Sequence, residues 1–408
     1  MSHIVIIGAG ITGVTTAYAL TERGHAVTVL DRHRYPAMET SFANGGQLSA
    51  SNSEVWNSSA TILKGLQWMF RKDAPLLMRL TPSWHKYSWI GEFVWNARNY
   101  RQNTIETARL AIEARRHLFS IADREQITFD LERRGILHIY HDKQSFEAGL
   151  RVNELLRQGG LDRSAVTPEE IRAIEPTLQT QCHGGFYTPS DSTGDIHKFT
   201  RGLAAACARR GVTFVFDANV DTIATSGSKF SIGWSEGTLQ PKFSIEADAT
   251  VVCAGVASRK FAAMLGDRLN VYPVKGYSIT ISLDSKQSRQ SAPYVSLLDE
   301  TAKIVTSRLG ADRFRVAGTA EFDGTNRDIR MDRILPLIEW VRRHFRDVDT
   351  SSITSWAGLR PMMPNMMPVV RPGRRPGVYY NTGHGHLGWT LSAATAEILA
   401  DLIGPAQG

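Results

Sequence analysis

Three glycines near the start of the chain have a spacing that can bind a phosphate group. Gly8, Gly10 and Gly13 form the pattern GxGxxG. The first glycine of such a pattern permits a tight turn, the second lets backbone N–H groups approach a pyrophosphate, and the third lets a helix pack closely on a strand. The carboxylate of Asp31 lies where it could accept hydrogen bonds from a ribose hydroxyl group. The residues that we expect to contact the cofactor in this segment are Gly8, Gly10, Ile11, Thr12, Gly13, Asp31 and Arg32.

The segments around these glycines have the order that a dinucleotide site needs. Residues 4–7 are an apolar, β-branched run that predicts a strand, and residues 14–22 predict a helix that ends before Gly24. Residues 26–30 predict a second strand, which ends at the acid. The helix N-terminus would face the phosphates with its partial positive charge. The alternative is a glycine-rich turn in an unrelated α/β domain, and this stretch alone does not distinguish NAD from FAD.

Three later segments also place glycine and small polar residues beside an expected strand or helix. Residues 41–48 read SFANGGQL, residues 249–253 form an apolar run before an Ala-Gly pair, and the glycine loop 383–390 lies between a strand and a helix. A second helix N-terminus could stabilise the anionic flavin edge of reduced FAD, so we favour FAD over NAD. The further contacts that we expect are Ser41, Asn44, Gly45, Gly46, Gln47, Leu48, Val220, Cys253, Ala254, Gly255, Gly383, Gly385, His386, Leu387, Gly388, Trp389 and Thr390.

Five sequence segments carry a family resemblance across nearly the whole chain. They are VIIGAGITGVTTAYAL, SFANGGQLS, PVKGYSIT, GLRPMMPNMMPVV and GHGHLGWTLSAATAEILADLI. With them the chain resembles the FAD-dependent amino-acid oxidase and dehydrogenase family, which includes D-amino-acid oxidase, glycine oxidase and sarcosine oxidase, and most of all its bacterial D-amino-acid dehydrogenases. Some sarcosine oxidases attach flavin through a cysteine, but residues 362–367 here contain none. The resemblance therefore implies non-covalent FAD.

The resemblance also implies the fold class, α/β within an α+β chain. A Rossmann-like FAD-binding domain with a parallel sheet would join a substrate domain with a mixed, largely antiparallel sheet and a helical cap. We expect the FAD-binding domain to comprise residues 1–60, 190–262 and 350–408, and the substrate and cap domain to comprise residues 61–189 and 263–349.

Three residues are candidates for substrate chemistry. The family position of Arg360 binds the substrate carboxylate, and a planar guanidinium group matches a carboxylate with two parallel hydrogen bonds; a structural ion pair is the alternative. Tyr277 could add a hydroxyl group or be a core tyrosine, and Lys275 could lie near the flavin or on the surface. His386 lies at or near the position of a second arginine in glycine oxidase. His384 and His386 could tune the flavin charge or cap the last helix.

The implied reaction is the oxidative deamination of a D-amino acid to a 2-oxo acid and ammonia, with hydride transfer from Cα to flavin N5. A cyclic or N-alkyl amino acid is the alternative substrate, and a subunit with structural flavin or an NAD-dependent enzyme are further alternatives. The likeness to dehydrogenases implies a quinone or another electron acceptor in preference to oxygen.

Composition and charge limit the partners. The chain has 408 residues, a net charge of +7 and three cysteines without disulfide or zinc spacing. We find no metal-ligand cluster, nucleic-acid motif or membrane span, and the sequence begins inside its first strand, so we expect a cytoplasmic protein. Residues 60–118 are expected to be mostly helical, with Pro75 and Pro82 dividing them. They combine aromatic with basic residues, which is typical of a peripheral element on the inner face of the membrane or of a packed cap domain.

Overall fold

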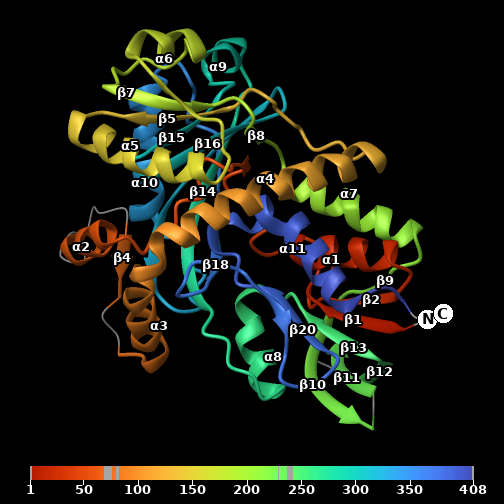
Figure 1. The fold of residues 1–408 in the computed structure, drawn as a ribbon. Coiled ribbons are helices and arrows are strands. Elements are labelled where there is room, and N and C mark those ends of the chain that lie inside the picture. Colours follow the sequence, from red (N-terminus) through yellow and green to blue (C-terminus); the bar gives the residue numbers. More distant parts are fainter. Residues whose placement is uncertain (1, 69–75, 80–81, 228, 237–241, 407–408) are drawn as a thin grey trace.

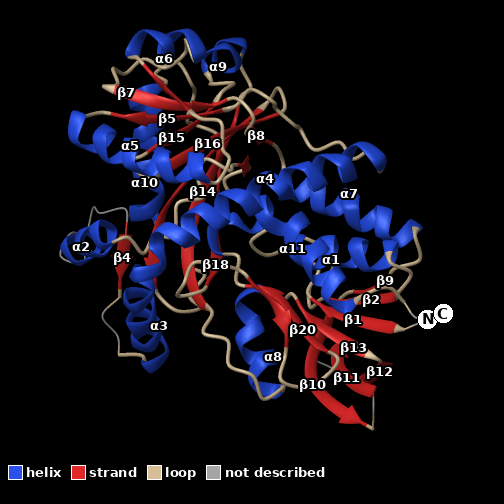
Figure 2. Ribbon diagram, viewed as in Figure 1, coloured by secondary structure: helices blue, strands red, loops and turns tan. Residues whose placement is uncertain are grey.

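The computed structural model describes residues 2–68, 76–79, 82–227, 229–236 and 242–406. Figure 1 shows two lobes, and the long helix α4 (Tyr100–Arg124) runs between them. Both ends of the chain lie together at the edge of one lobe, which contains a parallel sheet. A mixed sheet forms the other lobe (Figure 2).

The parallel sheet contains six strands of the described residues, in the order β19, β20, β13, β1, β2, β9. All neighbours run parallel except β19, which pairs antiparallel with β20. The apolar runs that form it are buried on both faces, as is usual in parallel sheets. The bounds are β1 (His3–Ile7), β2 (Ala26–Leu30), β9 (Thr213–Val215), β13 (Ala249–Val252), β19 (Val369–Pro372) and β20 (Val378–Thr382).

Three helices cover one face of this sheet. Helix α1 (Ile11–Glu22) packs against α7 (Ile196–Arg209) and α11 (Gly388–Ile403), and α11 also contacts α4. The predicted strand–turn–helix–strand order at the start of the chain and the strand–loop–helix order at its end are therefore confirmed. A small antiparallel sheet packs on the parallel sheet within the same lobe and is formed by β10 (Ala218–Ser226), β11 (Lys229–Glu236) and β12 (Lys242–Ala247).

The mixed sheet is largely antiparallel, as predicted. Among the described strands, only the pairs β5–β15 and β4–β17 of this sheet are parallel. The bounds are β4 (Leu76–Met78), β5 (Ile136–Tyr140), β6 (Ser164–Val166), β7 (Gly184–Thr188), β14 (Tyr272–Ser282), β15 (Ser296–Asp299), β16 (Ile304–Leu309), β17 (Arg313–Phe322) and β18 (Ile353–Met362). Helix α10 (Met331–His344) packs on β14 and β17.

One expected domain boundary differs from the strand pairing. Strand β18 falls inside segment 350–408, which we expected in the FAD-binding domain, but it pairs with β14 of the mixed sheet over its whole length. The reason is that its residues extend the antiparallel sheet before the chain returns to the other lobe at β19. We therefore propose that the last segment of the FAD-binding domain begins after residue 362.

Helices and short strands complete the second lobe. The helices are α2 (Ser59–Trp68), α3 (Trp84–Trp95), α5 (Lys143–Gln158), α6 (Pro168–Ile174) and α9 (Lys286–Ser291), and β3 (Gln47–Leu48) pairs with β8 (Ser192–Thr193). Helix α8 (Ser258–Met264) contacts β10 and β13 and therefore belongs to the first lobe. The described part of residues 60–118 is mostly helical, as predicted, except for strand β4. The expected break at Pro75 lies outside the described residues. Among the described helices, none is long and apolar enough to cross a membrane.

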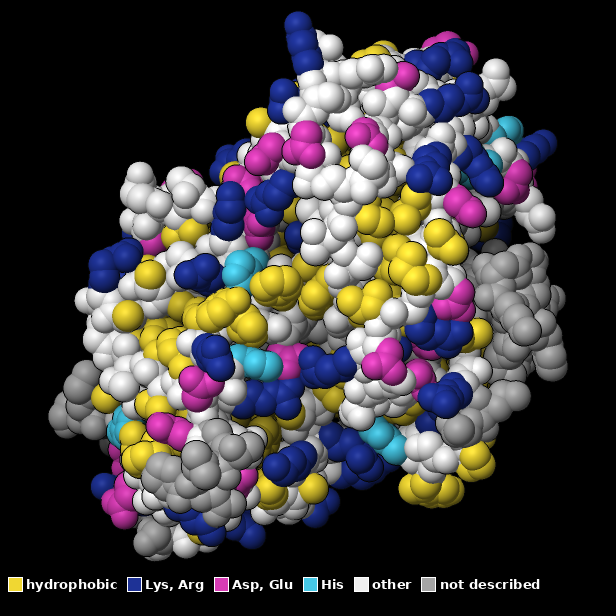
Figure 3. All heavy atoms as spheres, turned by 180° about the vertical axis from the view of Figure 1, so that it is seen from behind, with side chains coloured by type: hydrophobic (Ala, Val, Ile, Leu, Met, Phe, Trp, Pro, Cys, Tyr) yellow, Lys and Arg dark blue, Asp and Glu magenta, His cyan; other side chains and the backbone are white. Residues whose placement is uncertain are grey.

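The two lobes meet at a face with mixed chemistry. Seen from behind, hydrophobic side chains gather across the middle of the molecule, with Lys and Arg side chains beside them (Figure 3).

The three cysteines are free, and Cys207 and Cys253 are buried.

Candidate active site

A cavity of about 1370 Å³ is lined by residues from both sheets. It exceeds the volume of most small-molecule sites, which is roughly 300–1,000 Å³. It extends from the turn after β1 to strands β14, β17 and β18. Of the expected cofactor contacts, all line this cavity except Gly13 and Leu48.

The glycines after β1 have the geometry expected for the tight turn. Gly8 has a φ of +110°, and a Cβ atom there would lie 2.7 Å from the carbonyl oxygen of Cys253. A Cβ atom at Gly13 would lie 1.8 Å from the carbonyl oxygen of Gly8. At Gly10, in contrast, it would meet only the Oγ of Ser41, at 3.6 Å. Two glycines are thus required by the fold, and Gly10 leaves space toward the cavity.

The N-terminus of α1 borders the cavity. Its first residue, Ile11, donates its backbone N–H to the Oγ of Ser41 at 3.1 Å. The preceding Gly10 has no side chain to cap the helix, and no acidic residue lies in the first turn. The partial positive charge of this helix end is therefore available to an anionic group in the cavity.

Asp31 has a second role that the sequence did not indicate. Its Oδ2 accepts a hydrogen bond from the Ala9 N–H at 2.6 Å, and its Oδ1 accepts one from the His33 N–H at 2.8 Å. Burial raises the pKa of this carboxyl group, against the effect of these hydrogen bonds. A carboxylate offers about four lone-pair positions, so Asp31 can still accept hydrogen bonds from a ligand hydroxyl group.

Residues 41–48 connect the two lobes beside the cavity. Gly46, with a φ of +71°, donates its N–H to the Oδ1 of Asn44 at 2.9 Å. The side chain of Gln47 donates to the Oγ of Ser296 in the mixed sheet at 2.8 Å, and its backbone belongs to β3. Because both lobes hold this segment, its backbone groups have fixed positions at the cavity wall.

Helix α11 presents a second free N-terminus to the cavity. The side chain of its N-cap residue, Leu387, makes no cap bond, no acidic residue lies in its first turn, and Gly388, Trp389 and Thr390 line the cavity. The indole Nε1 of Trp389 is buried, and no described residue bonds to it. The expectation that this loop contacts the flavin end of FAD stays a prediction.

The two histidines before α11 are neutral, and neither caps the helix. Burial lowers the pKa of His384 to about 3 and that of His386 to about 4. His384 is hydrogen-bonded through Nε2 to Thr395 Oγ1 at 3.0 Å, and His386 through Nε2 to the carbonyl oxygen of Asn52 at 3.2 Å. The Nδ1 of His386 has no partner among the described residues, and its ring stacks on Trp56 with centroids 4.7 Å apart.

Arg360 offers a positive charge to the cavity. In strand β18 it pairs with Val274, and its Nη1 donates to the carbonyl oxygen of Thr319 at 3.1 Å. Burial lowers its pKa to about 10, so it is still charged at neutral pH. No carboxylate of the described residues forms a salt bridge with it. Among the described residues, Arg360 therefore has no acidic partner with which it could form a structural ion pair.

The structure does not bring Lys275 and Tyr277 to Arg360. Alternate residues of a strand face opposite sides, so the pairing of Arg360 with Val274 turns Lys275 and Tyr277 to the other face of the sheet. There the Oε2 of Glu321 accepts a hydrogen bond from the Tyr277 hydroxyl at 2.5 Å and lies 3.2 Å from the Nζ of Lys275. Tyr277 borders the cavity, but its hydroxyl group is bonded to Glu321, and Lys275 is fully buried.

Two residues beside Arg360 were missed by the sequence analysis. Gly276 makes room for the guanidinium group, and a glycine inside a strand was the available signal. Thr319 has a φ of +58°, which is rare for a β-branched residue, and its buried Oγ1 has no partner in the described structure. Nothing in its sequence neighbourhood indicates this conformation.

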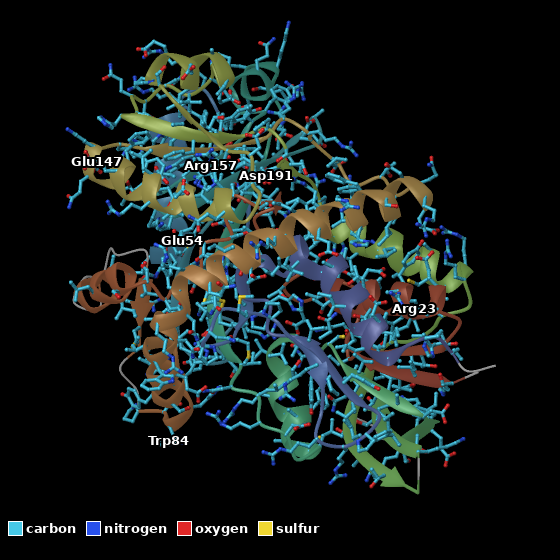
Figure 4. The ribbon with its side chains drawn as sticks, in the orientation of Figure 1. Arg23, Glu54, Trp84, Glu147, Arg157 and Asp191 are labelled. Atoms are coloured by element: carbon cyan, nitrogen blue, oxygen red, sulfur yellow. The ribbon has the colours of Figure 1, made fainter. Side chains whose placement is uncertain are left out.

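Charged side chains line the part of the cavity near α5. Glu54 lies in the interior of the molecule (Figure 4), where its Oε1 accepts a hydrogen bond from the Tyr100 hydroxyl at 2.6 Å. Burial raises the pKa of Glu54. Lys303 forms a 2.6 Å ion pair with Glu300, and Arg163 also faces this part of the cavity. This end can therefore bind a polar substrate group.

Outside the cavity, three side chains of types that can bind a metal ion lie close together. Their spacing in the sequence did not indicate this cluster. Ligand atoms of His141, Asp299 and His344 lie within 4.8 Å of one another. The Oδ2 of Asp299 is hydrogen-bonded to His141 at 3.0 Å and accepts a bond from the Trp340 indole at 2.9 Å. These bonds account for the cluster as part of the core of the mixed-sheet lobe.

Comparison with known proteins gives consistent matches along the chain. A family model described as "FAD dependent oxidoreductase" matches residues 3–402. D-amino acid dehydrogenase 3 of Mesorhizobium japonicum is 63% identical over 403 residues, which cover 99% of this chain and 97% of that protein. D-amino acid dehydrogenase of Paramagnetospirillum magneticum is 40% identical, covering 98% of this chain and 94% of that protein.

Solved structures give the same fold. Glycine oxidase from Bacillus cereus matches with a TM-score of 0.74 and 21% identity, covering 99% of this chain and 95% of that chain. L-proline dehydrogenase from P. horikoshii matches with a TM-score of 0.75 and 16% identity, covering 98% of this chain and 93% of that chain.

Proposed function

The chain belongs to the family of FAD-dependent oxidoreductases, and from this premise we propose that it oxidises D-amino acids and passes the electrons to a quinone. The substrate would lose a hydride from Cα and a proton from nitrogen, and water would hydrolyse the resulting imine to a 2-oxo acid and ammonia. The names of two relatives with 63% and 40% identity support the D-amino acid as substrate.

The residues of the cavity fit FAD. Two helix N-termini border it without an acidic residue in the first turn, and Gly10 leaves space beside the first of them. The buried indole N–H of Trp389 lacks a partner within the described chain, as a hydrogen-bond donor to a ligand would. When bound, FAD supplies the acceptor for the hydride. The chain would hold it without a covalent bond, through the residues that line the cavity.

The observation that carries the proposed substrate is the charge of Arg360, which has no counterion among the described residues. It lines the cavity and forms no salt bridge with the described residues. A charge that is partly withdrawn from water and lacks a counterion is costly, and a substrate carboxylate would supply the missing partner. With the carboxylate held in a fixed geometry, the Cα–H bond is oriented and the reaction becomes effectively unimolecular.

The neutral histidines suit a substrate that carries an amino group. His384 and His386 stay uncharged at neutral pH, so they do not repel a cationic ammonium group. The unpartnered Nδ1 of His386 is a hydrogen-bond acceptor if Nε2 carries the proton that is donated to Asn52. Amine binding would therefore rely on acceptor groups, and carboxylate binding on Arg360.

Anaerobic flavin reduction tests the substrate. We expect D-alanine and other D-amino acids to bleach the visible flavin spectrum, and L-amino acids to leave it unchanged. Faster bleaching by D-proline or N-methylglycine than by any primary D-amino acid would contradict the proposal and identify a secondary-amine dehydrogenase. No bleaching by any amino acid, with the flavin spectrum present, would indicate a structural flavin.

Helix α3 supports the proposal of a hydrophobic electron acceptor. Tyr87 and Val94 are half exposed and also line the cavity, so the cavity reaches the surface at this helix. On the same helix Trp84, at the end of α3 (Figure 4), is 85% exposed and Trp95 is 64% exposed. The guanidinium group of Arg98 lies 4.2 Å from the Trp95 ring. Exposed aromatic residues beside cations are typical of peripheral membrane contact, and a quinone could enter the cavity from there.

Two measurements test the acceptor and the membrane contact separately. Reduced enzyme should react with a short-chain ubiquinone faster than with oxygen; equal rates would make the protein an oxidase. The double variant Trp84→Ser/Trp95→Ser should sediment less with anionic vesicles than the wild type, whereas Leu335→Ser, which removes an exposed apolar side chain from α10, should sediment equally. Vesicle binding that is identical in all three would contradict the membrane contact.

A further inference from the structure

We propose that the hydroxyl group of Thr319 is a second ligand of the substrate carboxylate, beside Arg360. The proposal rests on the proposed function, because it assigns a further residue to the same site. It replaces Tyr277, whose hydroxyl group is bonded to Glu321 on the other face of the sheet.

The backbone at Thr319 is bent by an irregularity in the strand pairing. Tyr277 pairs with Gly318 and Lys275 pairs with Glu321, so Thr319 and Ala320 both lie opposite Gly276. Such bulges occur next to active sites and turn a side chain away from its regular direction. The φ of +58° at Thr319 agrees with this bulge. A β-branched residue rarely adopts that conformation, and unfavourable backbone conformations are concentrated at functional sites.

The bulge brings both polar groups of Thr319 to the site. Its carbonyl oxygen accepts the hydrogen bond from Arg360 Nη1 at 3.1 Å, so the residue lies against the guanidinium group. Its Oγ1 is buried and has no hydrogen-bond partner in the described residues, and Thr319 lines the cavity. A buried hydroxyl group without a partner is costly, so this one is best explained by a bond to a ligand.

The two groups together would define the orientation of a carboxylate. The guanidinium group has five N–H donors; one of them, on Nη1, bonds to the Thr319 carbonyl, and no bond from the others to a described residue is seen. The hydroxyl group would donate one further hydrogen bond from the neighbouring position. Both carboxylate oxygens would then be bound, and rotation about the Arg360 contact would be restricted.

The test uses FAD-loaded enzyme and two probes. Propanoate, which is D-alanine without its amino group, is titrated against the oxidised flavin spectrum, and kcat and KM are measured for D-alanine. Thr319→Val removes the hydroxyl group and keeps the shape, and Thr319→Ser keeps the hydroxyl group. Thr354→Val is the control, an exposed threonine on the strand that carries Arg360.

We expect Thr319→Val to weaken propanoate binding and to lower kcat/KM for D-alanine by a factor of about 10 to 100, the value of a hydrogen bond to a charged group. Thr319→Ser and Thr354→Val should stay within a factor of about 3 of the wild type. Ethylamine, which lacks the carboxylate, should be oxidised equally by wild type and Thr319→Val.

Three results would overturn this inference. They are propanoate binding that is equal in wild type and Thr319→Val, equal losses in Thr319→Val and Thr319→Ser, and the absence of propanoate binding in the wild type. Failure of the proposed function is distinguishable, because it would be seen as a wild-type flavin that no D-amino acid reduces, whereas the propanoate titration does not require turnover.

Discussion

The guanidinium group of Arg360 lies against the backbone of Gly276, where a side chain would otherwise be. A Cβ atom at position 276 would lie 2.3 Å from Cζ of Arg360. The two residues are neighbours on paired strands, since Gly276 pairs with Gly358 and Val274 with Arg360. The glycine therefore fixes how deeply the arginine lies in the sheet, and with it the position of the proposed carboxylate site.

Gly276→Ala should displace Arg360 without removing it. Because the added methyl group occupies the space of the guanidinium group, we expect kcat/KM for D-amino acids to fall by a factor of about 10 or more, as small misplacements of a positioning group commonly do. Gly91→Ala is the matched control, because a Cβ atom at Gly91 meets nothing within 4 Å. Steady-state kinetics on both variants check this, and equal values would mean that Gly276 has no positioning role.

Gly10→Val should fold but bind no FAD. A side chain at Gly10 has space on the protein side, where only Ser41 Oγ lies nearby, and would extend into the cavity. Gly13→Val, in contrast, would collide with the carbonyl oxygen of Gly8 and should not give folded protein. Circular dichroism and the visible spectrum of purified protein check both outcomes. A yellow Gly10→Val protein would contradict the dinucleotide assignment.

Lys275 is expected to matter for stability and not for catalysis. Lys275→Met leaves Glu321 buried with one partner fewer, but Arg330 still pairs with it, so we expect a cost below the roughly 3–5 kcal/mol of a buried charge left without any partner. The melting temperature should fall by several degrees, while the rate of flavin reduction in the folded enzyme stays near that of the wild type. A large loss in the rate of flavin reduction without a fall in melting temperature would indicate that Lys275 takes part in catalysis.

Acid should destabilise the protein through its buried histidines. Burial lowers the pKa of His384 to about 3, below the value of about 6.5 in an unfolded chain. Between these values the unfolded state binds the extra proton, so stability falls as the pH drops through this range. From pH 6.5 to 5 the loss from this one residue is about 2 kcal/mol. Melting curves of His384→Gln should therefore show a smaller difference between pH 7 and pH 5 than those of the wild type. An unchanged difference would contradict this role.

The sequence predicted the elements of this protein better than the direction of individual side chains. Regular signals such as the glycine spacing after β1 and the apolar runs of β1 and β2 depend on local chemistry, and the structure contains them. From the sequence, Tyr277 is a candidate hydroxyl group for substrate binding and Lys275 a candidate residue near the flavin, with a core tyrosine and a surface lysine as the alternatives. Their direction depends on the pairing of β14 with β18 and β17, which joins residues far apart in sequence.

Thr319 illustrates the same limit. Its conformation arises where β17 gains a residue relative to β14, and this extra residue is visible only once both strands are paired. Gly276, in contrast, could have been found, because a glycine within a strand often marks a close approach of another group.

The central claim is that Arg360 holds the substrate carboxylate, and the kinetics of Arg360→Lys test it most directly. Lysine keeps the charge but loses the planar pair of donors, so we predict that kcat/KM for D-alanine falls by a factor of about 100 while the flavin spectrum stays unchanged. Ethylamine should be a poor substrate of the wild type and lose little more in the variant. If Arg360→Lys oxidises D-alanine with near wild-type efficiency, the carboxylate is bound elsewhere and the account is contradicted.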